Sequence, residues 1–440
     1  MSVTEAQINA RAQLFGAATT KTFISILICL MVLAAGILIP LSMKNNEKGL
    51  TPAWKGLQED EKAFLDRVQE SAFWYFWNET DPDTGLVQDR ATNTEVSSIA
   101  AVGFGLSAIC VAETRGWITY DQAYERVLKT LKSFDPDSPL VEGERGFFYH
   151  WVDAKTGERA WESEISLIDT AILTAGALHA GQHFKGTEIE PLAGRIYGAV
   201  GWDWMMSGDL LTVVPGGEPW DGYDEYILAY LLALGSPTHP IPERSWDAMA
   251  SAYEWYSYGG VEFLTPDGGN TMLAYLYQFP LCWIDIRYVH DRYADYWQNA
   301  VAALKANRKF CLDEAAEKGW PELWGWTACD GKEGYLGYRG VFDDTVAPSA
   351  VAASIALIPE QAIPMLEHMY EEYGDRIWRE YGFTNAFNPA QNWYDEDYIG
   401  IDQGNIVLML EAFRSESVWD EFMRVPYVTT GLNKAGFVQD

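Results

Sequence analysis

Carboxylates in apolar and aromatic surroundings are the residues of this 440-residue chain with the clearest chemical potential. In the segment WESEISLIDTAILTAGAL, Glu162 and Asp169 are seven residues apart. In a helix that spacing equals about two turns, so both carboxylates would lie on one side, with Asp169 entering an apolar run. The structural alternative is that Glu162 and Glu164 are charges that complement a helix N-terminus and that Asp169 is a buried, hydrogen-bonded acid.

A second acidic cluster lies in PWDGYDEYILAYLLAL, where Glu225 is expected one turn into an otherwise apolar helix. Burial disfavours a charged carboxylate, so we expect a raised pKa for Glu225, as suits a general acid. Helix capping by Asp221 and Asp224 is the structural alternative. Two further acids, Asp330 in ACDGKEGYLGYRG and Asp402 in YIGIDQGNIVLML, lie in glycine-flanked turns that lead towards helices, and Asp402 could equally be an N-cap.

Such carboxylates suit glycoside cleavage, in which one acid protonates the leaving oxygen and another activates water or attacks. We predict Glu225 as the general acid and either Glu162 or Asp169 as its partner. The motifs of other chemistries are missing, because the chain contains no GxxxxGK(S/T), GxGxxG, HExxH or GxSxG sequence. The acidic turn at 81–90 departs from a calcium loop, so we expect no metal and no cofactor.

The elements that must position these acids are mostly helical. Apolar residues recur at helical spacing in about twelve stretches, separated by glycine, proline and aspartate. Only Gly146–Asp153 and Val261–Pro266 alternate as strands do. Twelve helices without a fixed repeat length predict an all-α fold, an (α/α)6 toroid, with the most apolar helices in its inner ring. The expected helices span residues 58–79, 95–115, 119–134, 161–185, 188–206, 221–235, 243–259, 290–313, 345–357, 359–373, 402–414 and 415–424.

Charge and aromatic content restrict the partners. The formal net charge of −32 excludes nucleic acid, because phosphate binding depends on lysine and arginine. Aromatic residues make up 14% of the chain, including 19 Trp and 24 Tyr, which exceeds what an ordinary core needs. Most of these rings would pack in the core, but a few along a groove would stack on sugar rings. The expected partner is therefore an oligo- or polysaccharide.

An apolar segment near the start, residues 22–43, contains no charged residue and would extend about 33 Å as a helix, enough to cross a membrane. We expect an uncleaved inner-membrane anchor at 22–43, after a polar segment at 1–21 and before a linker at 44–57. The catalytic domain would cover 58–425, followed by a tail at 426–440. A periplasmic or extracellular location follows from the substrate, since the charges that flank the anchor set no orientation.

The chain after this apolar segment resembles the bacterial glycoamylase-like family, which includes β-1,2-glucanases. The similarity covers about residues 58–425. The segments that carry it are GFFYHWVD, ISLIDTAILTAG, YDEYILAYLLALGSPTHP, YLYQFPLCWIDIR, FCLDEAAEKGWPELWGWTACDG, DDTVAPSAVAASIALIPEQAI, YGFTNAFNP and YIGIDQGNIVLMLEAFRSESVWDEFMR. The resemblance implies an (α/α)6 toroid, an extracytoplasmic location, no metal, cleavage of a β-glucan with β-1,2 linkages, and acids at Glu162, Asp169 and Glu225 bordering the cleft.

A groove at one end of the toroid is expected to combine stacking faces with groups that bind hydroxyls. Its predicted substrate-binding residues are Tyr149, His150, Trp151, Gln278, Trp283, Asp285, Arg287, Trp326, Asp330, Trp393, Tyr398, Asp402 and Gln403. Two other functions are compatible with the sequence: an exo-acting glycosidase or transglycosylase on related glucans, and a noncatalytic, membrane-anchored glycan-binding protein. A deep cleft with at least two converging acids would favour an enzyme over a binding protein.

Overall fold

The computed structural model describes residues 49–266, 272–337 and 342–439. The segment expected to form the membrane anchor, 22–43, lies outside the described residues. Within the described ranges, none of the helices is both long enough and apolar enough to cross a bilayer.

Along the chain, helices that keep one face in solvent alternate with helices that are buried almost throughout. The first helix of the solvent-facing set begins with exposed Glu59 and Asp60, whereas the nine residues from Ile227 to Gly235 are all buried. The solvent-facing helices are α3 (Glu59–Asn78), α5 (Tyr120–Lys132), α7 (Ile189–Ala199), α9 (Arg244–Ala250), α11 (Tyr296–Lys318) and α13 (Pro359–Ile377). The buried helices are α4 (Ile99–Arg115), α6 (Leu167–His183), α8 (Ile227–Gly235), α10 (Tyr275–Gln278), α12 (Pro348–Ala353) and α14 (Gly400–Arg414).

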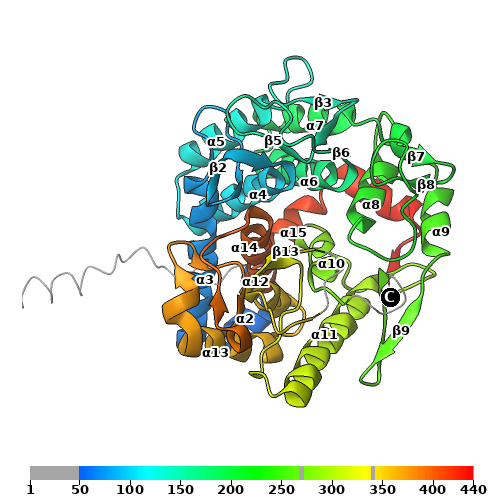
Figure 1. Ribbon diagram of the computed structural model, residues 1–440. Helices are drawn as coiled ribbons and strands as arrows, with labels where there is room; N and C mark the ends of the chain where they lie inside the picture. The colour runs from blue at the N-terminus through cyan, green and yellow to red at the C-terminus, as the bar shows by residue number, and fades with distance from the viewer. Residues whose placement is uncertain (1–48, 267–271, 338–341, 440) are drawn as a thin grey trace, which may run out of the picture. The chain divides into compact units, whose positions relative to one another are not determined.

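The two sets form an inner and an outer ring. Figure 1 shows α3, α5, α7, α9, α11 and α13 around the periphery and the buried helices nearer the centre. Within the inner set, α6, α4, α14 and α12 pack in succession, and α8 lies against α6. Each outer helix precedes an inner helix in the chain, which confirms the predicted helix-rich (α/α) toroid.

Short elements fill the connections between the rings. The remaining helices are α2 (Pro52–Gly56), η1 (Trp202–Met205), η3 (Pro280–Cys282), η4 (Ser354–Ala356), η5 (Pro389–Gln391), α15 (Ser417–Phe422) and α16 (Pro426–Lys434). Two antiparallel three-stranded sheets consist of β1 (Gln88–Arg90), β2 (Asn93–Ser98) and β5 (Trp151–Asp153), and of β3 (Gly143–Glu144), β4 (Phe147–Tyr149) and β6 (Ile165–Ser166). The two-stranded pairs are β7 (Met206–Ser207) with β8 (Leu210–Leu211), β9 (Trp255–Tyr258) with β10 (Val261–Leu264), β11 (Val289–His290) with β18 (Val438–Gln439), β12 (Cys329–Gly331) with β13 (Gly334–Leu336), β14 (Trp378–Arg379) with β15 (Gly382–Phe383), and β16 (Phe387–Asn388) with β17 (Trp393–Tyr394).

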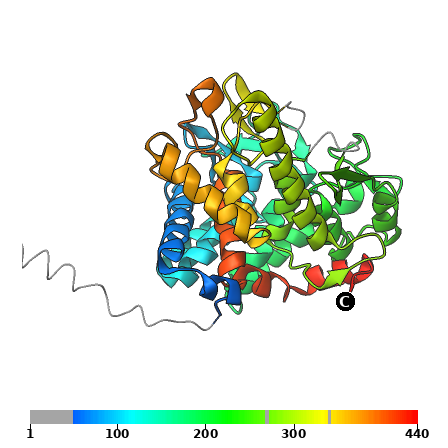
Figure 2. The same cartoon turned by 90° about the horizontal axis from the view of Figure 1, so that it is seen from below.

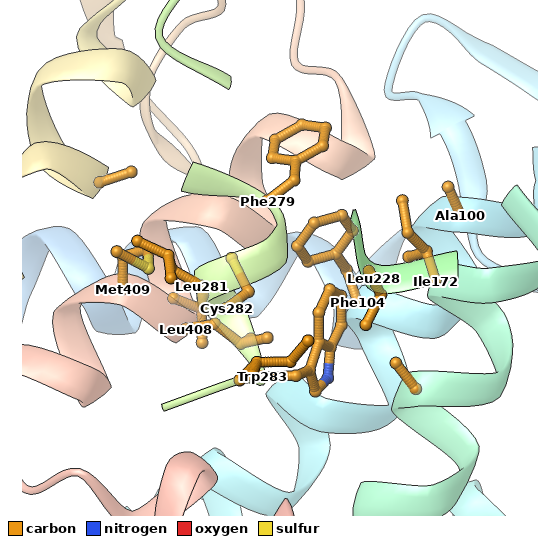
Figure 3. Packing of buried hydrophobic residues seen from close by; sticks show 14 of the residues in the cluster. Ala100, Phe104, Ile172, Leu228, Phe279, Leu281, Cys282, Trp283, Leu408 and Met409 are labelled. Carbon is orange, nitrogen blue, oxygen red and sulfur yellow. The ribbon is translucent and has the colours of Figure 1, made fainter. Parts of the chain in front are cut away.

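The core lies inside the inner ring, where α4, α6, α8, η3 and α14 meet (Figure 3). Small residues let the helices approach closely. A Cβ added to Gly103 of α4 would lie 2.4 Å from the carbonyl oxygen of Ile172, and one added to Gly176 of α6 would lie 2.0 Å from that of Gly103. These distances are shorter than van der Waals contact, so the α4–α6 interface depends on both glycines.

Several helices begin later than the hydrophobic pattern predicts. The expected helix at 161–185 starts at Leu167, because the Ser166 hydroxyl accepts a hydrogen bond from the Asp169 backbone N–H and forms the N-cap. Trp161 and Glu162 precede it with left-handed φ values of 51° and 54°. The expected helix at 221–235 likewise starts only at Ile227. Glu225 therefore lies just before its helix, and Glu162 and Asp169 do not share one.

Two other expectations are corrected between residues 243 and 282. The helix predicted at 243–259 ends at Ala250, and residues 255–258 form β9, which pairs with β10. The inner partner of α9 is instead α10, continued by η3, in a segment whose aromatic residues conceal its helical spacing.

The described part of the predicted tail (426–440), residues 426–439, belongs to the folded domain. Residues Pro426–Lys434 form α16, which packs along α8. A Cβ on Gly431 would lie 2.1 Å from the carbonyl oxygen of Leu231, so the two backbones are in direct contact. In Figure 2 this red C-terminal segment lies at the lower edge, away from the yellow and orange loops between α11 and α14.

We predict that Gly431→Ala lowers the free energy of unfolding by about 1–3 kcal/mol, because the new methyl group must push α16 away from α8. Gly194→Ala is the matched control, since Gly194 is interior to helix α7 and an added Cβ meets nothing within 4 Å. The control should be neutral or stabilising by about 0.5–1 kcal/mol, through helix propensity. Urea unfolding of both variants tests this, and equal stabilities would show that α16 does not need the close contact.

Candidate active site

A cavity of about 520 Å³ lies where three inner helices begin. Ser98 caps α4, and Asp169 and Asp402 lie in the first turns of α6 and α14. The N-terminal end of a helix carries a partial positive charge, which favours carboxylates placed there. The residues that line the cavity are Asp89, Arg90, Ser98, Ala100, His150, Trp151, Trp161, Ile168, Asp169, Ile172, Glu225, Tyr275, Phe279, Ala328, Tyr335, Gly337, Ile399, Ile401 and Asp402.

A larger cavity, of about 910 Å³, lies at the other end of α6, against α7 and the start of α16. Its carboxylates, Asp137 and Glu190, are exposed to solvent. Arg195, which also lines it, forms ion pairs with Asp135 at 3.0 Å and Asp137 at 3.8 Å. Exposed, screened carboxylates lack the environment that tunes an acid for catalysis, so the smaller cavity is the candidate active site.

Asp169 is held by two side chains from different segments. The Ser166 hydroxyl, which caps α6, also donates a hydrogen bond to one carboxylate oxygen of Asp169. The other oxygen lies 3.6 Å from Nε2 of His150. His150 is placed there because its backbone N–H donates to the carbonyl of Glu164 next to the β4–β6 pair. Asp169 is therefore buried but well supplied with partners.

His150 carries a positive charge in this acidic surrounding. Its Nδ1 lies 2.9 Å from Glu164 Oε1, and its ring stacks on Trp151 with a centroid separation of 3.5 Å. Burial disfavours the charged ring, but Asp169, Glu164 and Asp89 together outweigh burial and raise the pKa of His150 to about 8. The hydrogen bond from His150 in turn lowers the pKa of Glu164.

Glu225 has an environment of the opposite kind. It lies two residues before α8, and its backbone N–H donates to Asp224 Oδ1 at 2.7 Å. Burial, followed by the charges of Asp224 and Asp169, raises the pKa of Glu225 well above its ordinary value. The carboxyl group consequently keeps its proton at pH values where an exposed glutamate is ionised.

Two more acids, Asp402 and Asp89, line the cavity. Burial raises the pKa of Asp402 to about 7 in spite of hydrogen bonds from Asn385 at 2.6 Å and Ser349 at 3.2 Å. Burial also raises the pKa of Asp89, which accepts a hydrogen bond from the indole of Trp151 at 3.1 Å.

Among the described residues that line the cavity, Arg90 is the one arginine, and two acids outside the lining pair with it. Its guanidinium bonds Asp330 at 2.9 Å and Asp397 at 3.2 Å. Asp330 therefore fixes the position of Arg90 and does not itself line the cavity. The cavity as a whole remains acidic.

Five residues predicted from the sequence line the cavity together: His150, Trp151, Asp169, Glu225 and Asp402. Glu162 does not, because it is exposed on the turn before α6 and its carbonyl accepts a hydrogen bond from Arg159. Between the two predicted partners of Glu225, the structure brings only Asp169 into the same cavity.

The other predicted substrate-binding residues do not line this cavity, and most of them make structural contacts instead. Gln278 is fully buried and donates to the Ala350 carbonyl at 2.8 Å and to the Ser354 hydroxyl at 2.9 Å. Trp283 lies inside the core, as Figure 3 shows. Its indole N–H donates to the Ser107 hydroxyl at 2.9 Å.

Two of the predicted residues, Asp285 and Arg287, form an ion pair with each other near the start of α15. Arg287 pairs with Asp285 at 2.8 Å and with Glu416 at 2.6 Å, just before α15. Trp326 instead packs against Phe310, with ring centroids 5.1 Å apart. These side chains hold outer segments of the domain together.

The remaining predicted residues support turns and strands. Tyr149 lies under the guanidinium of Arg159, 4.7 Å from its ring centroid. Trp393 belongs to the β16–β17 hairpin, and the buried side chains of Tyr398 and Gln403 donate to backbone carbonyls at 3.3 Å.

Sequence reasoning missed several cavity residues. Asp89 and Arg90 lie in a three-residue strand with no motif around them. Trp161 and Tyr335 lie inside two of the acidic segments quoted above, next to residues that were chosen instead. Their aromatic side chains were a usable signal for a sugar site.

Comparison with known proteins identifies the family. Residues 218–426 match the glycoamylase family model, described as "Putative glucoamylase". The solved structure of a putative glucoamylase from Bacteroides uniformis is 30% identical, with a TM-score of 0.81, and the match covers 87% of this chain and 99% of that one. The chain belongs to the glycoamylase-like family.

Two further relatives have named activities. An endo-β-1,2-glucanase from Chitinophaga pinensis, solved with sophorotriose and glucose, is 28% identical with a TM-score of 0.80, over 86% of this chain and 99% of that one. A curated exo β-1,2-glucooligosaccharide sophorohydrolase (non-reducing end) from Parabacteroides distasonis is 27% identical over 422 residues. That match covers 85% of this chain but 58% of the relative, so the chain spans little more than half the length of that protein.

We predict that His150→Gln removes a stabilisation that depends on pH. Because the pKa of His150 is raised from 6.5 to about 8, its contribution is complete below pH 6.5 and is lost as the pH rises through about 8. The difference in free energy of unfolding between wild type and variant should be about 1–2 kcal/mol larger near pH 5.5 than near pH 9, measured by urea unfolding.

His239→Gln is the control for this experiment. His239 also pairs with a carboxylate, Asp203, at 3.3 Å, but its side chain is 46% exposed and solvent screens the pair. The pH dependence of its stability difference should be smaller. A pH-independent difference for His150→Gln would contradict the charged state assigned to His150.

Proposed function

We propose that this protein is a glycoside hydrolase that cleaves β-1,2-linked glucan or gluco-oligosaccharides with two carboxylates, Glu225 and Asp169. The observation that carries the proposal is that these two acids line one cavity in contrasting environments. Burial and neighbouring negative charge keep Glu225 protonated, whereas Asp169 is supported by a hydroxyl and by cationic His150. Environments that separate the protonation of two acids suit acid and base roles.

In the proposed mechanism, Glu225 donates its proton to the glycosidic oxygen as the bond to the anomeric carbon breaks. Asp169 acts on the other reactant, as the group that orients or activates the attacking water. His150 and the Ser166 hydroxyl contact the two carboxylate oxygens of Asp169 and hold them in a fixed orientation. Ile168 and Ile172 give this part of the cavity an apolar wall, and electrostatic interactions are stronger beside apolar groups than in water.

The substrate class is supported by charge and by the relatives. Among the described residues that line the cavity, the cationic side chains of Arg90 and His150 are already paired with acids, so the cavity offers little to bind an anionic sugar. A neutral saccharide, whose hydroxyls donate to carboxylates, is favoured. The β-1,2 linkage is inferred from the C. pinensis and P. distasonis proteins, which are named for endo and exo action respectively.

Product analysis on a panel of defined β-glucans, with linear and cyclic β-1,2-glucan included, tests the substrate and the mode of action together. Release of the disaccharide alone from linear chains would indicate exo action. Mixed products, together with cleavage of the cyclic glucan, would indicate endo action. Binding of glucans without cleavage would favour the noncatalytic alternative.

We predict that Glu225→Gln lowers turnover by about 10²–10⁴-fold while the protein stays folded, because the amide is nearly isosteric but cannot donate a proton to the leaving oxygen. Asp169→Asn should have a comparable effect. Asp221→Asn and Glu162→Gln are matched controls, since both carboxylates are exposed and neither lines the cavity. Near-normal turnover of Glu225→Gln on a substrate that the wild type cleaves would remove Glu225 from the mechanism.

We also propose that residues 22–43 anchor the protein in the inner membrane, with the catalytic domain in the periplasm or outside the cell. Support comes from the 22 consecutive uncharged, mostly apolar residues in this segment. The folded domain has its own fixed starting point, because Thr51 bonds the backbone of Phe413 and Arg414 at the end of α14.

A protein that starts at Lys48 is therefore predicted to fold, to remain active and to leave the membrane fraction. Activity assays and cell fractionation of the full-length and shortened proteins provide the measurement. If the shortened protein fails to fold, the apolar segment is part of the domain; if the full-length protein is found in the soluble fraction, the anchor is disproved.

A further inference from the structure

Two exposed aromatic side chains line the acidic cavity. Large hydrophobic side chains are mostly buried in this domain, yet Trp161 is 61% exposed and Tyr335 is 52% exposed. Among the strongly exposed large hydrophobic residues in the described ranges, only these two line the cavity. Aromatic surface left in water is unfavourable for folding, so its placement at a polar cavity indicates a ligand.

The turn that presents Trp161 is held in an unfavourable conformation. Trp161 and Glu162 both have left-handed φ values, of 51° and 54°, which side chains other than glycine rarely adopt. Arg159 fixes this turn by donating to the carbonyls of Glu162 and Ser163, the latter at 2.6 Å. Strain of this kind persists where surrounding contacts impose it, and it is common at ligand sites.

Trp161 is also connected to the acids of the cavity. Its ring meets Trp151 edge to face, with centroids 5.6 Å apart, and the indole N–H of Trp151 donates to Asp89. The Trp161 ring is therefore held against Trp151 on one side while most of its surface stays exposed. Such a rigid ring loses little conformational entropy on binding a sugar.

Tyr335 reaches the cavity from a distant part of the chain. It lies on β13, directly opposite Asp330 of β12, so both side chains project from the same face of the hairpin. Asp330 forms an ion pair with Arg90 of β1, and this pair fixes the hairpin against β1. The β12–β13 hairpin thus holds Tyr335 beside the cavity.

We infer that Trp161 and Tyr335 form a saccharide-stacking subsite at the mouth of the cavity, which binds a sugar unit removed from the bond that is cleaved. The inference rests on the proposed function. The two rings are largely exposed, whereas Asp169 is buried, so a sugar on the rings lies outside the catalytic pair. The apolar C–H faces of a neutral pyranose fit these rings, and its hydroxyls reach the surrounding carboxylates and water.

The subsite makes catalytic efficiency depend on chain length. Wild type and Trp161→Ala are compared by the ratio of kcat/KM for a β-1,2-linked chain of about ten units to that for the trisaccharide. One lost stacking contact should lower this ratio by about tenfold. Tyr335→Ala should lower it in the same direction, and Trp161→Tyr, which restores a ring face, should recover part of it.

Trp255→Ala is the matched control, because Trp255 is also exposed, at 56%, but lies on β9 and does not line the cavity. It should leave the ratio unchanged. Binding is measured separately by titration calorimetry of the same chains in the Glu225→Gln background, with and without Trp161→Ala. The long chain should lose about tenfold in affinity relative to the trisaccharide.

The outcomes separate the subsite from the proposed function. An active enzyme whose ratio is unchanged by Trp161→Ala, or whose two substrates lose efficiency equally, overturns the subsite and leaves the function intact. A wild type that cleaves no β-1,2-glucan but binds the long chain through Trp161 overturns the function and supports the subsite. If the wild type neither cleaves nor binds β-1,2-glucan, both the subsite and the proposed function are overturned.

Discussion

The direct contact between the backbones of α4 and α6 is the constraint on which the cavity depends. Gly103 and Gly176 allow it, because a side chain at either position would meet a carbonyl oxygen of the other helix. With the two helices this close, their first turns lie side by side, and Ser98 and Asp169 reach the same space. The close packing of α4 and α6 thus places the Asp169 carboxylate in the cavity.

The second constraint is electrostatic. A cavity that contains several acids must either pair them with cations or keep them protonated, because an isolated buried charge is strongly unfavourable. Both solutions occur here. His150 lies against Asp169, whereas the raised pKa values of Glu225 and Asp402 mark carboxyl groups that hold protons. The environments of the two acids differ because Asp169 lies against His150, whereas Glu225 is buried near the charges of Asp224 and Asp169.

The aromatic residues show why sequence reasoning located the site only in part. Trp283 and Trp161 look alike in sequence, since each lies within two residues of an acid, yet Trp283 is fully buried and Trp161 is mostly exposed. Burial depends on which helix face meets a neighbour, and that is not a local property. Most residues chosen for a sugar groove proved to be core or turn residues for this reason, so the carbohydrate assignment rests on the acid pair and on the relatives.

The amino-acid sequence by itself determined the helical class of the domain, the approximate positions of most helices and the family, and it predicted Glu225 together with Glu162 or Asp169 as candidate acids. These follow from hydrophobic spacing, from carboxylates beside apolar runs, and from long matching segments, which are all local features. Only the tertiary structure decided that Glu162 is outside the cavity, that α16 belongs to the domain, and that Asp89, Arg90 and Tyr335 join the site. Those outcomes depend on where helices begin and on which distant segments touch, and backbone strain at Trp161 and Glu162 or contact across Gly431 leaves no periodic pattern in the sequence.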